Sequence, residues 1–229
     1  MDIEELRRQI DSGELDLIIS DSCCIGSGSL SDSGGTNIDY TINHGWNVIS
    51  ASLCDKHWSS YQIELMQFIE DQAYDEDKLN SVLSSIQIED LHWDWFKKSI
   101  YYRSDEYEWF YMFANNKPQG ACLIYHPKPS AIDGENIFYV EYLATAPWNR
   151  NNPMAVREFK GVGSIILKCV LDFAVNTLHL KPGFSLHSLP QAVGYYEKLG
   201  MMKFQDRDKE KLAYFEMPRN SASKMLGVA

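Results

Sequence analysis

The stretch from Tyr139 to Gly200 constrains the fold of this chain more than any other segment. It opens with the apolar run YVEYLATA, whose length and composition are typical of a buried strand. The glycine-containing segment REFKGVG then leads into an apolar-periodic helix pattern, and the run FSLHS predicts another strand. The stretch ends with PQAVGYYEKLG, in which a leading proline and a closing glycine are typical of a helix. This alternation of strands and helices predicts an α/β domain with a mixed sheet.

The preceding part of the chain predicts further strands and helices. We expect a strand at 46–53, a helix at 56–74 and a second helix over 76–100, from the spacing of their apolar residues. Apolar runs at 109–114 and 121–126 flank NNKPQG, and turn residues between two such runs predict a hairpin.

Three more strands and two more helices complete the expected order. The strands are expected at 137–146, 183–188 and 211–217, and the helices begin near Gly163 and Pro190. The resulting order is a strand, two helices, three strands, a helix, a strand, a helix and a strand.

The chain is predicted to divide into three parts. Residues 1–45 form an N-terminal extension, 46–217 form the domain, and 218–229 are a tail. Within the extension, 15–20 are an apolar patch, LDLIIS, and 21–35 are dominated by serine, glycine and aspartate. Such a composition buries too little apolar area to offset the entropy of ordering, so 21–35 is interpreted as a flexible linker.

Composition narrows the classes of function. The 229 residues carry a formal net charge of −11, from 21 Lys and Arg against 32 Asp and Glu, which disfavours nucleic-acid binding. The acidic balance is compatible with a cationic amine as substrate, or with solubility alone. No apolar run approaches the roughly 18 residues of a membrane helix. The charged first residues also lack a signal peptide's apolar core, so we expect a cytoplasmic protein that does not bind membranes.

The cysteines argue against a metal site. The chain has five of them, an odd number, and their spacing matches no common metal-binding pattern. We expect free thiols in a reducing compartment and no bound metal.

The segment from Tyr139 to Gly200 resembles the acyl-CoA-dependent N-acetyltransferases of the GNAT superfamily. The resemblance lies in the strand, glycine loop and helix order, and in the pattern Ala-x-x-x-Tyr-x-x-x-Gly at Ala192, Tyr196 and Gly200. It spans about 46–217 and is weak before position 90. It implies the GNAT fold, a splayed central sheet with helices on both faces, and acetyl-CoA as cofactor.

The glycine loop is the predicted site for the cofactor's phosphates. Gly161 and Gly163 let the backbone approach a pyrophosphate, and the following helix begins with free N–H groups and the positive end of its dipole. Arg157 and Lys160 add positive charge. The alternative is a tight turn that serves helix–sheet packing. The full predicted set in this segment is Arg157, Phe159, Lys160, Gly161, Val162, Gly163 and Ser164.

The strand before the loop is the predicted site for the pantetheine arm. In the family, backbone groups of the corresponding strand pair with pantetheine, which the resemblance assigns to Leu143, Ala144 and Thr145. Preplaced N–H donors of this kind stabilise the negative charge that develops on a reacting carbonyl oxygen. The alternative is a central strand whose small side chains pack tightly, and the two roles are compatible.

Two residues are candidates for acid and base catalysis. Glu141 is the only charged residue in its apolar run, and partial burial would raise its pKa and make it a better base for the incoming amine. The alternative is a glutamate that reaches solvent or pairs with a cation. The resemblance implies that Tyr196 protonates the departing CoA thiolate, and the alternative is core packing. His187 is either a proton relay or a buried, hydrogen-bonded histidine.

The chain departs from the family pattern at two positions. Glu158 stands where the family has Arg or Gln, and Leu189 stands where it has Asn, whose hydrogen bond Ser188 is expected to replace. A different feature, Trp93-Asp94-Trp95, is either a cage for a cationic amine or a pair of core anchors around an acid.

The function expected from the sequence is transfer of an acetyl group from acetyl-CoA to a primary amine by direct attack. The alternative is a non-catalytic acyl-CoA-binding or regulatory protein on the same scaffold, as Glu158 and Leu189 suggest. Residues 1–45 are a candidate for protein interactions. The acceptor is not identified by the sequence, and the protein is expected to be a monomer or a homodimer.

Overall fold

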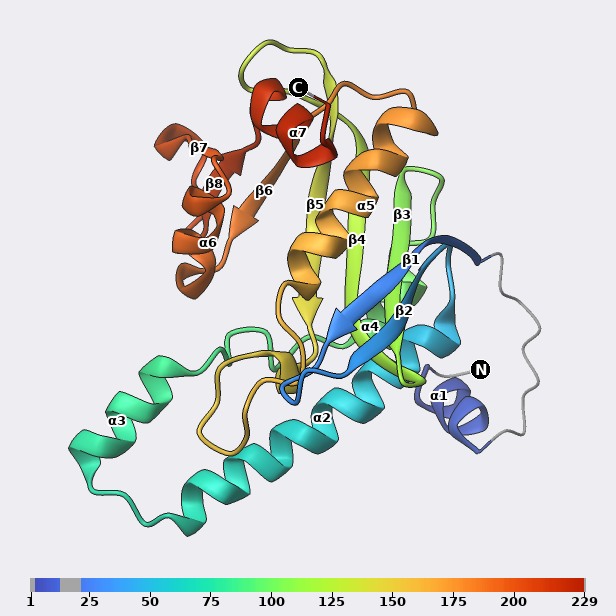
Figure 1. The fold of residues 1–229 in the computed structure, drawn as a ribbon. Coiled ribbons are helices and arrows are strands. Elements are labelled where there is room, and N and C mark those ends of the chain that lie inside the picture. The colour runs from blue at the N-terminus through green and yellow to red at the C-terminus, as the bar shows by residue number, and fades with distance from the viewer. Residues whose placement is uncertain (1–2, 13–21, 229) are drawn as a thin grey trace. The chain divides into compact units, whose positions relative to one another are not determined.

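The computed structural model describes residues 3–12 and 22–228 (Figure 1). The apolar patch predicted at 15–20 lies outside these residues. The α-helices are α1 (Ile3–Asp11), α2 (Val48–Asp71), α3 (Glu76–Ser85), α4 (Trp95–Tyr101), α5 (Val162–Asn176), α6 (Val193–Lys198) and α7 (Arg219–Leu226). Short 3-10 helices are η1 (Pro147–Asn149), η2 (Pro190–Ala192) and η3 (Gln205–Arg207). The strands are β1 (Cys23–Ser31), β2 (Asn37–His44), β3 (Tyr107–Ala114), β4 (Lys117–Pro129), β5 (Asn136–Thr145), β6 (Phe184–Ser188), β7 (Met202–Lys203) and β8 (Ala213–Glu216).

The strands form one mixed sheet in the order β1-β2-β3-β4-β5-β6-β8-β7. The pair β5–β6 is parallel, whereas β1–β2, β2–β3, β6–β8 and β7–β8 are antiparallel. The predicted mixed α/β class is therefore confirmed. No helix in the described ranges is long and apolar enough to cross a membrane.

The chain forms two compact units. The first comprises Met1–Arg103, Trp109–Ala121 and Ala144–Val162, and the second comprises the remaining segments up to Ala229. Strands β3, β4 and β5 each contribute residues to both units. The predicted division at 45 and 217 stays a prediction, although the secondary structure inside the two terminal segments differs from the expectation.

The structure contradicts the strand predicted at 46–53. Asn47 caps a helix there, because its side-chain oxygen accepts a hydrogen bond from the Ser50 N–H at 2.9 Å, and α2 begins at Val48. The apolar residues that suggested a strand are buried at helical spacing, at Val48, Ala51 and Cys54. The helix predicted at 56–74 is confirmed as the later part of α2, although α2 ends at Asp71.

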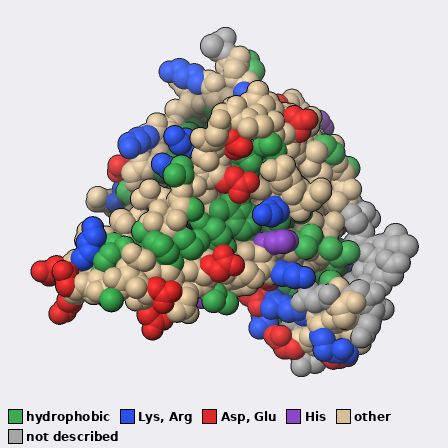
Figure 2. Space-filling model, turned by 60° about the horizontal axis from the view of Figure 1, so that its bottom comes forward, with side chains coloured by type: hydrophobic (Ala, Val, Ile, Leu, Met, Phe, Trp, Pro, Cys, Tyr) green, Lys and Arg blue, Asp and Glu red, His purple; other side chains and the backbone are tan. Residues whose placement is uncertain are grey.

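The single helix predicted over 76–100 is also wrong, because two aspartates each begin a separate helix. Asp75 accepts a hydrogen bond from the Lys78 N–H and caps α3, and Asp94 accepts one from the Lys97 N–H and caps α4. The acidic residues around the α2–α3 junction are exposed, and Figure 2 shows acidic side chains gathered at that end of the molecule. This agrees with a solvated surface.

Of the linker predicted at 21–35, the structure describes 22–35, and these residues are not a flexible linker, because 23–31 form β1. This strand pairs with β2, and β2 pairs with β3. The turn between β1 and β2 is held by Asp32, whose carboxylate accepts the N–H groups of Gly34 and Thr36 at 2.8 Å. Backbone pairing with a neighbouring strand and burial of Leu30 supply the order that composition alone does not predict.

The secondary structure predicted for the middle of the chain is confirmed. A two-residue turn at Asn115 and Asn116, both with positive φ, joins β3 to β4 as predicted, and Asn tolerates this geometry. Strands β5 and β6 and helices α5 and α6 lie where the sequence indicates. The predicted tail contains α7, which buries Ala222 and ends at Gly227 with φ of +80°.

Candidate active site

Glu141 lines a cavity of about 510 Å³ in the second unit. Tyr139 and Glu141 lie two residues apart on β5 and project to the same face, since side chains alternate along a strand. His187 on β6 pairs with Tyr214 on β8, and both also line the cavity. Their ring centroids are 5.1 Å apart. We call this space the Glu141 cavity.

The environment of Glu141 raises its pKa above the ordinary value. Burial is the main cause, and the positive charges of Lys209 and Lys128 oppose it. This confirms the predicted direction of the shift. A carboxylate with a raised pKa is a stronger base toward an ammonium group when ionised.

His187 is held between two hydrogen bonds. Its Nδ1 lies 2.6 Å from the hydroxyl of Tyr139, and its Nε2 lies 2.9 Å from the carbonyl oxygen of Arg207. A carbonyl oxygen only accepts, so Nε2 donates the proton and Nδ1 of the neutral ring accepts from Tyr139. Burial lowers the pKa of His187, which favours this neutral form. Of the two predicted roles, the geometry favours the hydrogen-bonded histidine.

Tyr196 lies on the opposite face of the sheet from the Glu141 cavity. Its ring contacts Phe215 at 6.1 Å between centroids, whereas the neighbouring Tyr214 lines the cavity. Successive residues of a strand point to opposite faces. Tyr196 is buried, at 8% exposure, and burial raises its pKa, so the phenol stays protonated.

The parallel pairing of β5 with β6 ends just before Glu141. The register joins Phe138 to Phe184 and ends where Val140 meets Leu186, although β5 continues to Thr145. Figure 1 shows the two strands diverging beyond this paired segment. The predicted splay of the sheet is therefore present beyond Val140 and Leu186, with Glu141 on one face of the sheet and Tyr196 on the other.

The other predicted cofactor residues in the second unit differ in their burial and in the hydrogen bonds that their side chains already make. Leu143 is half-buried and follows the end of the β5–β6 pairing. Ser164, in the first turn of α5, has its hydroxyl 2.9 Å from that of Tyr195. Ser188 is buried, and its hydroxyl donates to the Leu189 carbonyl at 2.8 Å. The expected replacement of the family's Asn by Ser188 is thus at odds with a hydroxyl that is already bonded to backbone.

The turn before α5 places Gly161 in the left-handed region of backbone conformation. Gly161 has φ of +78°, and nothing lies within 4 Å of where a Cβ atom would be. Arg157 and Lys160 are exposed. The next residue, Val162, is buried and begins α5. These features fit a loop whose glycine faces open space.

Phe159 does not fit the predicted cofactor role. Its side chain is 1% exposed, and its N–H donates to Oδ1 of Asn149 at 3.0 Å. Asn149 and Trp148 in turn both donate to Oε1 of Gln119. Phe159 therefore anchors the loop in the core, because its ring and its N–H are both engaged within the protein.

Sequence reasoning missed Arg150, which lies in the connection between β5 and α5. Its guanidinium makes two hydrogen bonds to Asp90, at 2.6 and 2.5 Å, and two to the Thr145 carbonyl, at 2.9 and 2.7 Å. The side chains of Arg150 and Asp90 are only 7% and 11% exposed. The pair ties the end of β5 to the segment before α4. A charge in a connecting segment carries no pattern that reveals such a partner.

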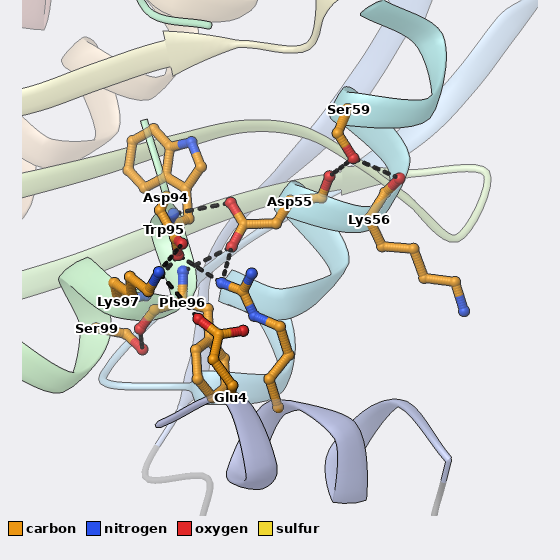
Figure 3. A network of polar contacts seen from close by, with 10 residues as sticks. Glu4, Asp55, Lys56, Ser59, Asp94, Trp95, Phe96, Lys97 and Ser99 are labelled. Atoms are coloured by element: carbon orange, nitrogen blue, oxygen red, sulfur yellow. Dashed lines mark hydrogen bonds and ion pairs between the residues drawn. The ribbon is translucent and has the colours of Figure 1, made fainter. Parts of the chain in front are cut away.

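Asp94 and the backbone N–H of Trp95 belong to a network of polar contacts in the first unit (Figure 3). Asp94 caps α4 and forms an ion pair with Arg7, and Arg7 also pairs with Asp55 at 3.1 Å. Burial raises the pKa of Asp55 to about 6, although its carboxylate accepts the N–H groups of Trp95 and Phe96.

Trp95 is a core residue rather than a wall of a cation cage. It is 2% exposed and contacts Trp58 and Trp109 through edge-on ring packing. The adjoining cavity measures about 520 Å³ and is lined by Arg7 as well as Asp55 and Asp94. Because Arg7 already pairs with both carboxylates, the arrangement favours the core-anchor alternative.

No group of three or more His, Cys, Asp or Glu residues in the described ranges is arranged to hold a metal ion. No family model matches the chain, and no curated protein matches it.

The chain is similar in fold to several solved acetyltransferase structures. A nucleotide-linked sugar GNAT, FdhC, is 12% identical, with a TM-score of 0.47 over 81% of this chain and 89% of that one. The PaiA N-acetyltransferase from Thermoplasma acidophilum, in complex with coenzyme A, is 11% identical with a TM-score of 0.44, over 76% and 97%. An acetyltransferase from Thermus thermophilus is 15% identical with a TM-score of 0.46, over 77% and 96%.

Proposed function

We propose that this chain is an N-acetyltransferase of the GNAT type, which transfers acetyl from acetyl-CoA to a primary amine by direct attack. The observation that carries the proposal is the divergence of β5 from β6. Their pairing ends at Val140 and Leu186, with Glu141 on one face of the sheet and Tyr196 on the other. A pantetheine arm lying along β5 at this divergence would have a base on one face and an acid on the other.

Two elements are proposed to hold the cofactor. Backbone groups of Leu143 and Ala144 and the N–H of Thr145, at the end of β5, would pair with the pantetheine arm, because the Thr145 carbonyl already accepts two hydrogen bonds from Arg150. The first N–H groups of α5 have no partner within the helix, and they are proposed to bind phosphate with Arg157 and Lys160. The proposed phosphate set is completed by Gly161, Val162, Gly163 and Ser164. Acetyl-CoA supplies an acetyl group activated as a thioester.

The side chains have separate tasks in the proposed reaction. Glu141 accepts a proton from the ammonium form of the acceptor, which frees the nitrogen lone pair for attack. Its raised pKa suits this transfer near neutral pH. Tyr196 donates its phenolic proton to the departing sulfur. Tyr139 and His187 hold each other in place beside Glu141 and leave the histidine neutral.

Cofactor binding is the first test. Calorimetry is expected to show acetyl-CoA binding, and amines added afterwards are expected to release free CoA with a thiol signal. No binding at millimolar acetyl-CoA would overturn the proposal. Binding without CoA release for any amine would instead identify a non-catalytic acyl-CoA-binding protein.

The role of Tyr196 is tested by a matched pair of variants. Tyr196→Phe keeps the buried ring and removes the proton donor, so kcat is expected to fall by about 10²-fold, the lower end for general acid catalysis. Tyr195→Phe removes the hydroxyl that contacts Ser164, and is expected to raise the KM for acetyl-CoA more than it changes kcat. Steady-state kinetics separate the two. An unchanged kcat in Tyr196→Phe would leave Tyr196 as a packing residue.

A further inference from the structure

The Glu141 cavity is richer in positive charge than the chain as a whole. Lys128, Arg207 and Lys209 line it, against the carboxylates of Glu106 and Glu141. The chain carries a net charge of −11, so a cavity with three cations and two acids departs from its surroundings. In 3–12 and 22–228, none of the three cations lies within 4.0 Å of a carboxylate oxygen, the limit for an ion pair.

The cations are held beside the proposed base. The Nζ atom of Lys128 lies 5.9 Å from the ring centroid of Tyr139, and the guanidinium carbon of Arg207 lies 5.9 Å from that of Tyr214. Lys128 and Lys209 are also close enough to Glu141 to act on its pKa. Their positive charges therefore flank the point where the acceptor amine would lose its proton.

The segment that carries Arg207 and Lys209 is anchored by its own backbone. The Arg207 carbonyl accepts the hydrogen bond from His187, and the Lys209 backbone exchanges two hydrogen bonds with Leu212, at 3.0 and 2.8 Å. Between these two residues, the carboxylate of Asp208 accepts a hydrogen bond from the Tyr214 N–H at 2.7 Å. The two cations thus stand on an ordered segment, with the intervening acid engaged by backbone.

We propose that the acceptor is a primary amine whose carrier also bears an anionic group, a phosphate or a carboxylate, held by Lys128, Arg207 and Lys209 while the amine faces Glu141. This inference rests on the proposed acetyl transfer. Of the two explanations for the acidic net charge, it favours solubility over a cationic acceptor. A second positive charge on the acceptor would meet three like charges. An anion gains charge-assisted hydrogen bonds from them. Tyr107 and Tyr125, whose ring centroids are 5.4 Å apart, add an aromatic wall for the carrier.

Matched amines test the charge of the carrier. Glucosamine 6-phosphate is compared with glucosamine, β-alanine with β-alaninamide, and spermidine serves as the polycation. The anionic member of a pair is expected to have a kcat/KM at least tenfold higher at low salt, with the advantage falling as salt rises. The phosphate and carboxylate pairs show which anion the site prefers. Equal or better turnover of the neutral amines and spermidine overturns the inference.

Lysine variants test the residues. Lys128→Met keeps the apolar stem of the half-buried lysine, Lys209→Ala removes an exposed one, and the double variant is expected to abolish most of the anionic advantage through KM. Lys203→Ala is the control, because Lys203 pairs with Phe215 and so lies on the other face of the sheet. The same loss in the control, or none in the double variant, counts against the proposal.

Binding measured without turnover separates this inference from the proposed function. Calorimetry with glucosamine 6-phosphate alone is expected to show binding that the double variant loses. If no amine is acetylated but this binding and its loss are seen, acetyl transfer is refuted and the anion site stands. If amines are acetylated without such binding or preference, acetyl transfer stands and the anion site is refuted.

Discussion

Replacement of Glu141 by glutamine is expected to lower kcat/KM for acetyl transfer by about 10²–10⁴-fold, the usual contribution of a general base. Glutamine keeps the shape of the side chain but accepts no proton at neutral pH. The KM for acetyl-CoA is expected to change little, because the loss concerns the acceptor amine. Initial rates with a fixed amine and varied acetyl-CoA provide the measurement.

The pH profile ties this loss to a specific proton. Glu141 acts as a base only when ionised, so activity is expected to fall as the pH drops through its pKa, which burial raises above the ordinary 4.5. Glu141→Gln should lack this acidic limb. His187 is a second titratable group that lines the same cavity, and burial lowers its pKa, so His187→Asn is the necessary comparison. If the limb survives in Glu141→Gln and disappears in His187→Asn, the histidine is the base.

A folding defect would not explain the expected loss. A carboxyl whose pKa is raised by folding binds its proton more tightly in the folded state than in the unfolded one. Its stabilising contribution is complete below the unfolded pKa and is lost as the pH rises through the folded pKa. At neutral pH the ionised Glu141 therefore costs stability, and Glu141→Gln is expected to unfold at the same or a higher temperature.

Replacement of Arg150 by methionine is expected to lower the free energy of unfolding by about 3–5 kcal/mol, the cost of leaving one member of a buried ion pair alone. Asp90 would remain as a nearly buried, unpaired carboxylate, and the Thr145 carbonyl would lose two donors. Urea unfolding followed by circular dichroism gives the change.

Arg219 provides a matched control for this prediction. It pairs with Asp133 at 3.7 Å, and the two side chains are 51% and 45% exposed. Exposed pairs contribute about 0–1 kcal/mol, so Arg219→Met should have a small effect. Equal losses in the two variants would show that burial of the Arg150–Asp90 pair is not what makes it important. Replacing Arg150 and Asp90 together by apolar residues is expected to recover part of the loss.

The parts of the fold that could be predicted are those in which local signals and burial agree. The turn at Asn115 and Asn116 needs only positive φ, which Asn tolerates, and β5 and α5 have long, consistent apolar patterns. The prediction of a strand at 46–53 was wrong because its apolar residues fit the spacing of a helix as well as that of a strand. The side chain of Asn47 caps the helix that forms there. The β1–β2 hairpin was not predicted because its order comes from the pairing of β2 with β3, which lies far along the chain.

The residues of the candidate site also differ in whether the sequence alone reveals them. Glu141 stands out in the sequence because a lone charge in an apolar strand is costly, and Tyr196 stands out because it matches a family pattern. Lys128, Arg207 and Lys209 carry no such signal. They are surface-type residues in separate segments, and the folded chain alone brings them to one cavity.

The sequence by itself predicted the mixed α/β class and the glycine turn before α5, because strand, helix and turn patterns depend on neighbours within a few positions. It also singled out Glu141, as a lone charge in an apolar run, and Tyr196, through the family resemblance. Only the tertiary structure decided that the β5–β6 pairing ends at Val140, that Glu141 and Tyr196 lie on opposite faces of the sheet, and that cations gather beside Glu141. These features depend on strand register and on contacts between residues far apart in the chain. Local periodicity and composition carry no record of either.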